Sequence, residues 1–481
     1  MQIKLTNGTS IPVEMHKIKI VQKTNLRPIH QRIKAIEDAG YNTFLLRSGD
    51  VFLDMLTDSG TNAMSDNQLA AMMQADDAYA GSESFYKLQE AVKDILGFKM
   101  VMPVHQGRAA EHLLAKSFVT PGSVVIMNYH FTTSKAHVEL MGGKVLELCG
   151  DVAFETASDN PFKGNMDLDK LKAAIENYGA EKVAYIRMEA TTNLIGGQPF
   201  SVQNLKDVRK IASHYKIPLV FDGSLISEDA FLIKQREKAY ANASIQEIYK
   251  TLMEQVDILY LSGRKSAAVR GGMIATNHKE YFDKILPWLP VYEGFATYGG
   301  MSTKEVEAMA VGIREMTDIN NAGSGAEFVE YFVRRLVERG VPSVTPAGGL
   351  AAHVDAKRFV PHIPQSDYPA GALAAAIYIV SGVRSMERGT MSMDRDENGN
   401  DVFSDMELAR LAVPRRTYTM SQIEYAVDRI AWLYEHRDLI KGLKFVEEPP
   451  VLRFFFGRLK ALDGWDKNLA KAFEADFGQA C

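Results

Sequence analysis

The segment DILYLSGRKSAAVRGGMIAT, residues 257–276, joins an apolar run to a Ser-Gly break, two adjacent cations, a glycine pair and a second apolar run. Short apolar runs bounded by turn residues are typical of buried strands. In open parallel sheets, ligands bind outside the carboxyl ends of the strands. Lys265 directly follows the first predicted strand, so it is the first candidate for a functional residue.

The same pattern extends upstream to about residue 123, where short apolar runs alternate with amphipathic segments. This alternation predicts an α/β fold with a mostly parallel sheet covered by helices. Asp167 and Asn204 are the predicted N-caps of two of the helices. The predicted strands are 123–128, 144–150, 182–189, 217–224, 257–263 and 271–276, and the predicted helices include 168–179 and 204–215.

Beyond about residue 320 the pattern changes to long helical segments and a Gly/Pro-rich passage. We therefore predict three parts. Residues 1–50 form an N-terminal arm and part of a small domain, 51–319 a large cofactor-binding domain, and 320–481 a small α+β domain. In the last long helix, Ser421 and Glu424 have the spacing of a capping box.

Composition favours an enzyme that acts on a small molecule. The chain has 481 residues, of which 46% are hydrophobic and 24% charged, and a net charge of -5, so it can bury a large core. A pI near 6.2 and the lack of a sustained basic block argue against nucleic acid or an anionic membrane as partners. Two cysteines, no signal-like start and no apolar run of about 18 residues predict a reducing, cytoplasmic location.

Polar residues that follow the predicted strands suggest a specific cofactor. Asn193 follows one strand, Asp222 ends another, and Ser262 and Lys265 follow a third. A lysine can condense with the aldehyde of pyridoxal phosphate, and an aspartate can keep the pyridine nitrogen protonated. Taken alone, an Asp after a strand is more often an N-cap, and a Lys there is more often a solvated surface residue.

A candidate phosphate site precedes these residues in the chain. Gln106, Gly107 and Arg108 open a helical pattern, where backbone N–H groups can bind an anion. A glycine at a helix start is more often only a turn. The order of phosphate loop, acid and lysine is what favours pyridoxal phosphate over these alternatives.

Several sequence blocks also resemble the β-eliminating lyases, the family of tyrosine phenol-lyase and tryptophanase. The blocks that carry the resemblance are residues 39–66, DDAYAGSESFY (76–86), HQGRAAEHLL (105–114), NLIGGQPFS (193–201), YEGFATYGG (292–300), GVRSMERG (382–389), ARLAVPRRTYT (409–419) and 441–458. The resemblance implies a pyridoxal-phosphate-dependent transferase fold of type I, like that of aspartate aminotransferase. It also implies a homotetramer with active sites between subunits and a monovalent cation, K⁺, nearby.

Carried over by position, the resemblance assigns most of the site. Lys265 is the Schiff-base lysine, Asp222 the partner of the pyridine nitrogen and Tyr79 an acid that touches the phosphate. Arg410 is the anchor for the substrate carboxylate, for which a planar guanidinium is suited. The remaining cofactor residues are Gln106, Gly107, Arg108, Phe131, Asn193, Ser262 and Arg264, the remaining carboxylate residues are Thr57, Ser59 and Asn193, and the cation residues are Gly60, Asp77 and Arg270.

The residues that would contact the leaving group favour the tyrosine phenol-lyase side of the family. These are Thr132, Met386, Arg388, Phe454 and Phe455, whereas Phe295 is more like the tryptophanases. The implied reaction is α,β-elimination of an aromatic or related amino acid, through an aldimine at Lys265 and a quinonoid, to pyruvate, ammonia and the leaving group.

The two main departures from the family pattern are at Leu225 and Arg270, beside the milder changes at Asp77, where the family often has Glu, and at Arg264, where it usually has Lys. Leu225 stands where both kinds of lyase carry an arginine, and Arg270 where the family often has an uncharged residue. Because Leu225 removes a cation from the site wall, a second hypothesis is a biosynthetic enzyme that replaces the β-substituent of a modified amino acid. A third is a cofactor-binding protein without catalysis, which the joint presence of Lys265, Asp222, Tyr79 and Arg410 disfavours.

Overall fold

The computed structural model describes residues 1–478 and contains a seven-stranded sheet with the six predicted strands and one more. β10 runs antiparallel to both of its neighbours, and the other neighbouring pairs are parallel. The prediction of a mostly parallel sheet is confirmed. The strand order is β4 (Met100–Val104), β10 (Gly272–Thr276), β9 (Ile258–Ser262), β8 (Leu219–Asp222), β7 (Val183–Glu189), β5 (Val124–Met127) and β6 (Lys144–Glu147).

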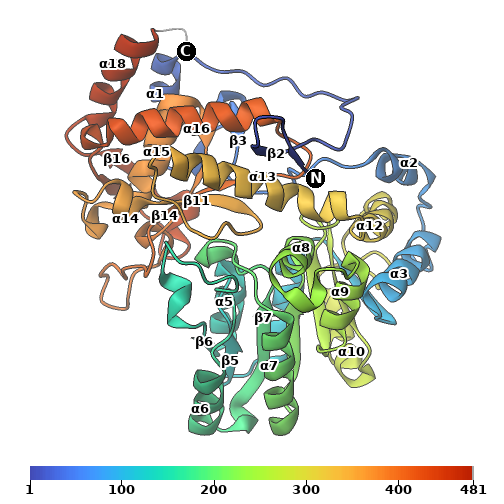
Figure 1. The fold of residues 1–481 in the computed structure, drawn as a ribbon. Helices are drawn as coiled ribbons and strands as arrows, with labels where there is room; N and C mark the ends of the chain where they lie inside the picture. Colours follow the sequence, from blue (N-terminus) through green and yellow to red (C-terminus); the bar gives the residue numbers. More distant parts are fainter. Residues whose placement is uncertain (479–481) are drawn as a thin grey trace.

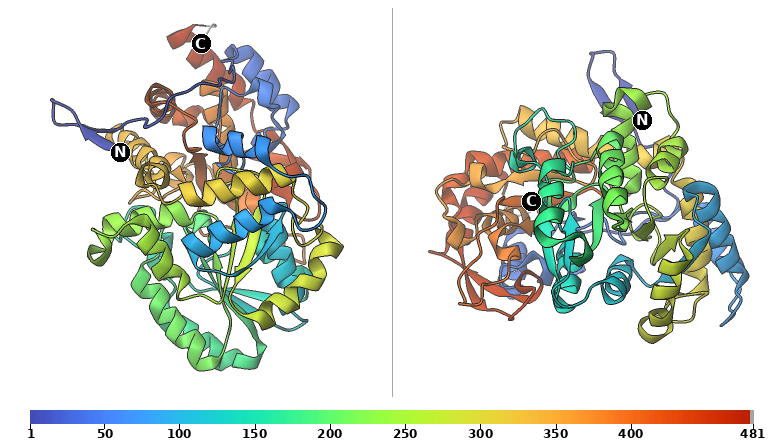
Figure 2. Two further views of the ribbon diagram at one scale, coloured as in Figure 1. Left: turned by 90° about the vertical axis from the view of Figure 1, so that its right-hand side faces the viewer. Right: turned by 90° about the horizontal axis from the view of Figure 1, so that it is seen from below.

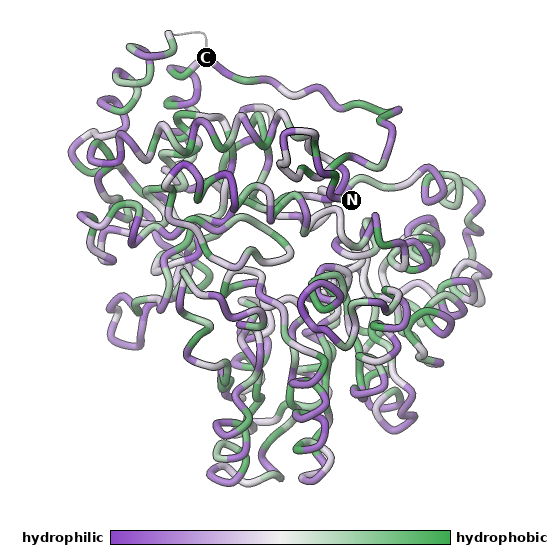
Figure 3. Tube along the Cα trace, in the orientation of Figure 1, coloured by the Kyte–Doolittle hydropathy of each residue, from purple (hydrophilic) through white to green (hydrophobic). Residues whose placement is uncertain are grey.

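Both faces of this sheet are buried. Side chains alternate between the two faces along each strand, so neighbouring residues enter different apolar clusters. Leu259 and Leu261 belong to one apolar cluster, and Ile258 and Tyr260 belong to another. Helices cover the sheet in the lower half of Figure 1. They include α3 (Glu83–Leu96), α4 (Gly107–Phe118), α5 (Thr132–Leu140), α6 (Leu168–Tyr178), α7 (Val202–Tyr215), α8 (Ile226–Arg236), α9 (Ile245–Met253), α10 (Lys279–Ile285) and α12 (Thr303–Glu315). Along the outer helices, Figure 3 alternates between hydrophilic and hydrophobic residues.

A second core unites the two ends of the chain. One apolar cluster contains residues from Ile29 to Leu56 together with residues from Phe328 to Phe473. Its elements include a three-stranded antiparallel sheet, α1 (Ile29–Asp38), α13 (Ile319–Glu338), α15 (Pro369–Ser381), α16 (Met420–Glu435) and α18 (Trp465–Phe477). The sheet has the order β11 (Ala351–Asp355), β14 (Leu408–Ala412) and β13 (Met386–Arg388).

This second core bears on the domain division, which stays a prediction. Leu53 and Met55 lie in the cluster that holds the chain termini, and β3 (Leu53–Asp54) pairs with β12 (Val383–Arg384). We therefore propose that the first boundary lies after Leu56 rather than at residue 51.

Two predicted helix starts are wrong by a few residues. Ser201, not Asn204, caps α7, whereas Asp167 caps α6 as predicted. The capping box of α16 is formed by Thr419 and Gln422, two residues before the predicted pair. The sequence fits the Ser/Thr-x-x-Glu/Gln pattern in both registers, so spacing alone does not select one.

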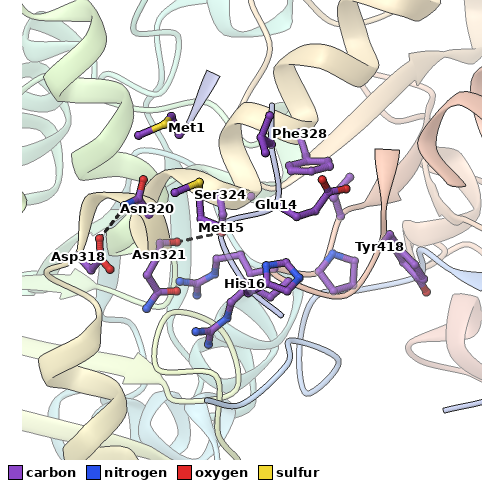
Figure 4. A pocket seen from close by; sticks show the side chains of 16 residues that line it. Met1, Glu14, Met15, His16, Asp318, Asn320, Asn321, Ser324, Phe328 and Tyr418 are labelled. Atoms are coloured by element: carbon purple, nitrogen blue, oxygen red, sulfur yellow. Dashed lines mark hydrogen bonds between the residues drawn. The ribbon is translucent and has the colours of Figure 1, made fainter. Parts of the chain in front are cut away.

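An N-terminal hairpin of β1 (Gln2–Lys4) and β2 (Ser10–Pro12) packs on α13 at the edge of the molecule (Figure 2). The guanidinium of Arg334 donates to the carbonyl oxygen of Ser10, and the Met1 ammonium pairs with Glu327. Between this segment and α13 lies a small cavity of about 100 Å³, where His16 and Phe328 appear in Figure 4. Within residues 1–478 no helix is long and apolar enough to cross a membrane.

Two buried acids of the small sheet meet beside Gly389. A Cβ atom at Gly389 would collide with Glu407 Oε2 and lie 3.0 Å from Glu387 Oε1, and neither oxygen has a hydrogen-bond partner. Burial, and then the charge of Glu407, raise the pKa of Glu387 from 4.5 to about 7. Glu387 is therefore protonated in the folded protein at pH values where it is ionised in the unfolded chain.

We expect Glu387→Gln to stabilise the protein at pH 8 but not at pH 5. A raised folded-state pKa means that stability falls as pH rises from about 4.5 to about 7, by up to ~3 kcal/mol. The amide has no proton to lose and escapes this cost. Thermal unfolding of both proteins at the two pH values measures the difference. An equal shift in melting temperature at both would contradict ionisation as its cause.

Candidate active site

A cavity of about 370 Å³ lies at the carboxyl ends of β7, β8 and β9. Sixteen residues that the sequence analysis assigned to the site line it, namely Thr57, Ser59, Gln106, Gly107, Arg108, Phe131, Thr132, Asn193, Asp222, Ser262, Arg264, Lys265, Met386, Arg410, Phe454 and Phe455. They come from segments nearly 400 residues apart. The cavity is large enough for a small-molecule ligand.

Lys265 is placed for chemistry rather than for solvation. Its side chain is only 11% exposed, and its Nζ lies 3.8 Å from Asp58 Oδ1 and 5.6 Å from the centre of the Phe131 ring. The backbone carbonyl of Lys265 accepts hydrogen bonds from Arg415 Nη2 and Asn62 Nδ2, which fixes the turn after β9. The alternative of a solvated surface lysine does not fit this burial.

Asp222 ends β8 and is fixed on both carboxylate oxygens. Oδ1 accepts from the backbone N–H of Ser224 at 3.0 Å. Oδ2 accepts from Arg187 Nη2 at 2.6 Å and from the Tyr260 hydroxyl at 2.9 Å. Asp222 is therefore a rigid anionic acceptor at the cavity wall, which is the arrangement that a protonated pyridine nitrogen requires.

The start of α4 fits a phosphate group. No side chain caps this helix, and Gly107 and Arg108 of its first turn line the cavity, where backbone N–H groups can bind an anion. A Cβ atom on Gly107 would come within 2.9 Å of Ser262 Cβ, so only glycine allows the helix to approach β9 this closely. Burial, and then the neighbouring Arg270 and Arg108, lower the pKa of Arg264. Arg108 and Arg264 thus place two guanidinium groups at this end of the cavity.

Arg410 lies in the small sheet and faces the same cavity. Its Nη1 donates to Asn193 Oδ1 at 2.6 Å and its Nη2 to the carbonyl oxygen of Leu56 at 2.9 Å, while its Nε has no partner. Burial lowers the pKa of Arg410 to about 10. A desolvated guanidinium with an unmet donor is suited to a carboxylate ligand.

Aromatic side chains line another part of the cavity. The Phe44 ring lies 5.4 Å from that of Phe454 and 5.0 Å from that of Phe455, measured between ring centroids. Leu225 is 2% exposed and packs with Leu350, Ala351 and Ala412. The cavity therefore combines polar cofactor and carboxylate ends with an apolar wall.

The model of the β-eliminating lyase family matches residues 54–429. This protein belongs to the β-eliminating lyase family. Tyrosine phenol-lyase of Symbiobacterium sp. (strain SC-1) is 44% identical over 451 residues, which cover 93% of this chain and 98% of the relative. Tyrosine phenol-lyase of Intrasporangium calvum is 45% identical over 450 residues, which cover 93% and 95%.

Solved structures support the fold. Serine palmitoyltransferase of Sphingomonas wittichii matches with a TM-score of 0.57 at 13% identity, over 81% of this chain and 88% of that one. An aminotransferase of Staphylococcus aureus matches with a TM-score of 0.54 at 14% identity, over 80% and 94%. The expectations of a type I fold, of pyridoxal phosphate as the cofactor and of a carbon–carbon lyase are confirmed.

Three residues assigned to proton transfer or substrate binding, Arg388, Tyr79 and Phe295, lie outside the cavity lining. The two guanidinium Nη atoms of Arg388 donate to Ser404 Oγ at 3.0 Å and to the Tyr129 hydroxyl at 3.1 Å. Tyr79 is 72% exposed and stacks on Phe295, with ring centroids 5.4 Å apart. The structure thus brings Tyr79 and Phe295 together, but on the surface of the protomer.

The predicted cation site of the lyase stays a prediction. Gly60 lies against the guanidinium of Arg264, while Asp77 and Arg270 are exposed. The neighbouring Asp76, rather than Asp77, accepts hydrogen bonds from the first turn of α3. Among residues 1–478, no group of three or more His, Cys, Asp or Glu side chains could hold a metal ion.

Sequence reasoning missed five residues of this lyase site, which are Asp58, Glu111, Arg187, Glu189 and Tyr260. A signal for two of them was present, because Arg187 and Glu189 are charged residues within an otherwise apolar strand. A charged residue within such a run needs a partner in the fold. Asp58 and Glu111 carry no comparable signal, since their partners are distant in the sequence.

Proposed function

We propose that this lyase removes the β-substituent of an aromatic amino acid, with tyrosine as the first candidate, and releases pyruvate, ammonia and the leaving group. The observation that carries the proposal is the convergence of Lys265, Asp222 and Arg410 on one cavity. The relatives named tyrosine phenol-lyase support the choice of substrate.

Several residues of this chain bind the cofactor, and one of them also transfers the proton. When bound, pyridoxal phosphate supplies an electron sink that stabilises negative charge at the substrate Cα. Lys265 would anchor the cofactor and would accept the Cα proton of the substrate, and Asp222 would hold the pyridine nitrogen. The start of α4, with Gln106, and the β9 residue Ser262 would hold the phosphate, and Phe131 would lie against the ring.

Residues at the other end of the cavity orient the substrate. Arg410 binds the carboxylate together with Thr57 and Ser59, and Asn193 connects this group to the cofactor side. Asp58 lies 3.8 Å from Lys265 Nζ and provides the local counter-charge of the ammonium group. The aromatic ring of the substrate packs on Phe454 and Phe455 with Thr132 and Met386 beside it.

A biosynthetic enzyme that replaces the β-substituent is the second candidate. Its support is Leu225, which is buried among apolar side chains and places no cation at this wall. Buried polar partners left without that cation would cost about 1 to 3 kcal/mol. An enzyme that acts on another modified amino acid does not need those buried polar partners, so Leu225 would carry no such cost.

We expect purified protein to release pyruvate and phenol from tyrosine in equal amounts. Pyruvate, phenol and ammonia are measured on the same sample, with and without an added carbon nucleophile. Equal release of pyruvate and phenol supports elimination of tyrosine. Incorporation of the nucleophile without pyruvate would support the second candidate and overturn the first.

We also propose that the protein assembles as a homotetramer in which one subunit completes the site of another. Tyr79 lies outside the cavity of its own protomer, where it stacks on Phe295 and contacts the Tyr298 ring edge-on. Burying this exposed aromatic cluster in a subunit contact would be favourable. There Tyr79 would reach the cavity of the partner subunit.

Mixing two inactive variants tests this arrangement. If Tyr79 acts in the neighbouring subunit, Lys265→Ala and Tyr79→Phe should restore about a quarter of the wild-type activity after dissociation and random reassociation. The mass of the assembly is measured by light scattering on the same samples. If Tyr79 acts within its own subunit, the mixture stays inactive.

A further inference from the structure

A buried group of charged and polar residues surrounds Asp222 and has no assigned role. Arg187 is 1% exposed and lies within β7, beside the strand that carries Asp222. Glu189 on β7, Tyr260 on β9 and Glu111 on α4 complete the group. All four side chains contact Asp222 directly or through one another.

Arg187 is held on all three of its guanidinium nitrogens. Nε donates to the Tyr260 hydroxyl at 2.8 Å, Nη1 to Glu189 Oε2 at 3.1 Å and Nη2 to Asp222 Oδ2 at 2.6 Å. Arginine remains charged in proteins, and a buried cation requires counter-charge. The cation is therefore shared between Asp222 and Glu189.

The hydrogen bonds of Tyr260 favour one protonation pattern of the group. Its hydroxyl has one proton and two neighbouring acids, Asp222 Oδ2 at 2.9 Å and Glu111 Oε1 at 3.2 Å. Both contacts are satisfied if Tyr260 donates to Asp222 and a protonated Glu111 donates to Tyr260. Burial, which raises the pKa of Glu111 to about 7, favours this arrangement.

The charges then match those of a protonated ring. Burial raises the pKa of Glu189, and the charge of Arg187 opposes that rise. With Arg187 positive and with Asp222 and Glu189 ionised, one negative charge is left for the pyridine nitrogen. Glu189 also accepts a hydrogen bond from the backbone N–H of Asn193, whose side chain binds Arg410. The ring end and the carboxylate end of the site are thus joined by one hydrogen-bonded chain.

We propose that Arg187, Glu189 and Tyr260 are positioning residues for Asp222, and that together they set how strongly the cofactor's ring nitrogen holds its proton. The negative charge of Glu189 offsets the positive charge of Arg187, so the charge of Asp222 remains available to the ring nitrogen. Tyr260 withdraws part of that charge through its hydrogen bond. The ionisable groups around Asp222 are Glu111 from α4, Tyr185, Arg187 and Glu189 from β7, and Tyr260 and Lys265 from β9 and the turn after it.

Two substitutions should act in opposite directions. Glu189→Gln leaves Arg187 without its second counter-charge, so the ring nitrogen should lose its proton at a lower pH, about tenfold more readily. Tyr260→Phe removes a donor from Asp222 and leaves a stronger acceptor, so the ring nitrogen should keep its proton to a higher pH. A general loosening of the fold would not produce shifts of opposite sign.

The experiment uses the whole protein loaded with pyridoxal phosphate that carries ¹⁵N in the ring. The ¹⁵N chemical shift of the bound ring is followed against pH without substrate, and thermal unfolding checks that each variant is folded. Glu387→Gln, a change of a buried acid in the small sheet, is the matched control and should titrate as the wild type does. Arg187→Lys keeps the positive charge with fewer donors. The pH at which its ring nitrogen loses the proton should be closer to the wild-type value than in Arg187→Gln.

The inference rests on the proposed role of Asp222, and the outcomes separate the two. If wild-type protein does not bind the cofactor at Lys265, the proposed function fails. If it binds the cofactor but folded Glu189→Gln and Tyr260→Phe both titrate as the wild type does, the group is only structural and the inference is overturned. Should Glu189→Gln not fold, an unchanged titration in Tyr260→Phe overturns it alone.

Discussion

Replacing Lys265 with alanine is expected to abolish covalent attachment of pyridoxal phosphate and to lower turnover by about 10³-fold or more. The lysine amine is the only lysine nitrogen among the described cavity-lining residues, and its neighbours Asp58 and Phe131 hold it toward the cavity. Its loss removes both the anchor of the cofactor and the base for the Cα proton. No nearby group replaces either role, since the remaining cations of the lining are arginines.

The measurement is the visible absorbance of the lysine-bound cofactor, together with pyruvate release. Lys163→Met is a matched control, because Lys163 is also buried but donates to the backbone carbonyls of Glu155 and Thr345, outside the cavity lining. That variant should be less stable yet keep the absorbance band. A persistent band in Lys265→Ala would mean that another amine binds the cofactor and would overturn the assignment.

Much of the fold was predictable because it depends on local patterns. Alternation of side chains along strands and the three-and-four spacing in helices are properties of short segments, so all six predicted strands occur in the sheet. The antiparallel direction of β10 depends on its two neighbours, and the short segment between Ser262 and Gly272 is consistent with a reversal. The register of a helix cap is also local, but two registers fitted α16 equally well.

The candidate site was predictable where a polar residue ends a strand. Asp222 and Lys265 were found in this way, since the end of a parallel strand places a side chain at the ligand-binding edge. Asp58 and Glu111 depend on contacts across long sequence separations and were missed. Arg388 matches a family block, yet in this fold it binds Tyr129 and Ser404 instead of lining the cavity.

The roles of Tyr79 and Phe295 could not be predicted from the sequence for a different reason. Their stacking on the surface is a contact within one protomer, whereas their proposed roles need a second subunit. A single sequence specifies such an interface only through exposed apolar residues, and these are ordinary on protein surfaces. If Tyr79 acts in a neighbouring subunit, as proposed, its place in the site depends on assembly and cannot be read from one chain.

Replacing Arg410 with methionine is expected to lower kcat/KM by about 10²- to 10³-fold, as for other buried charge partners that are truncated. The guanidinium is fully buried between Asn193 and the backbone of Leu56, and its unpaired Nε leaves a donor for a carboxylate. Methionine retains much of the volume but offers no donor. The loss should appear mainly in substrate binding, because Arg410 lies on the carboxylate side and not at the ring nitrogen.

The free amino acid alanine, added as an inhibitor, is the sharpest probe of this role. It has the carboxylate of the substrate and no aromatic group. Its inhibition constant should rise strongly in Arg410→Met and stay nearly unchanged in Arg388→Met, because Arg388 is occupied by Tyr129 and Ser404. The absorbance of the bound cofactor should be the same in both variants, which separates substrate binding from cofactor binding. If alanine binds Arg410→Met as tightly as it binds the wild type, another residue anchors the carboxylate. Equal losses in both variants would instead point to a collapse of the small sheet that carries the two arginines.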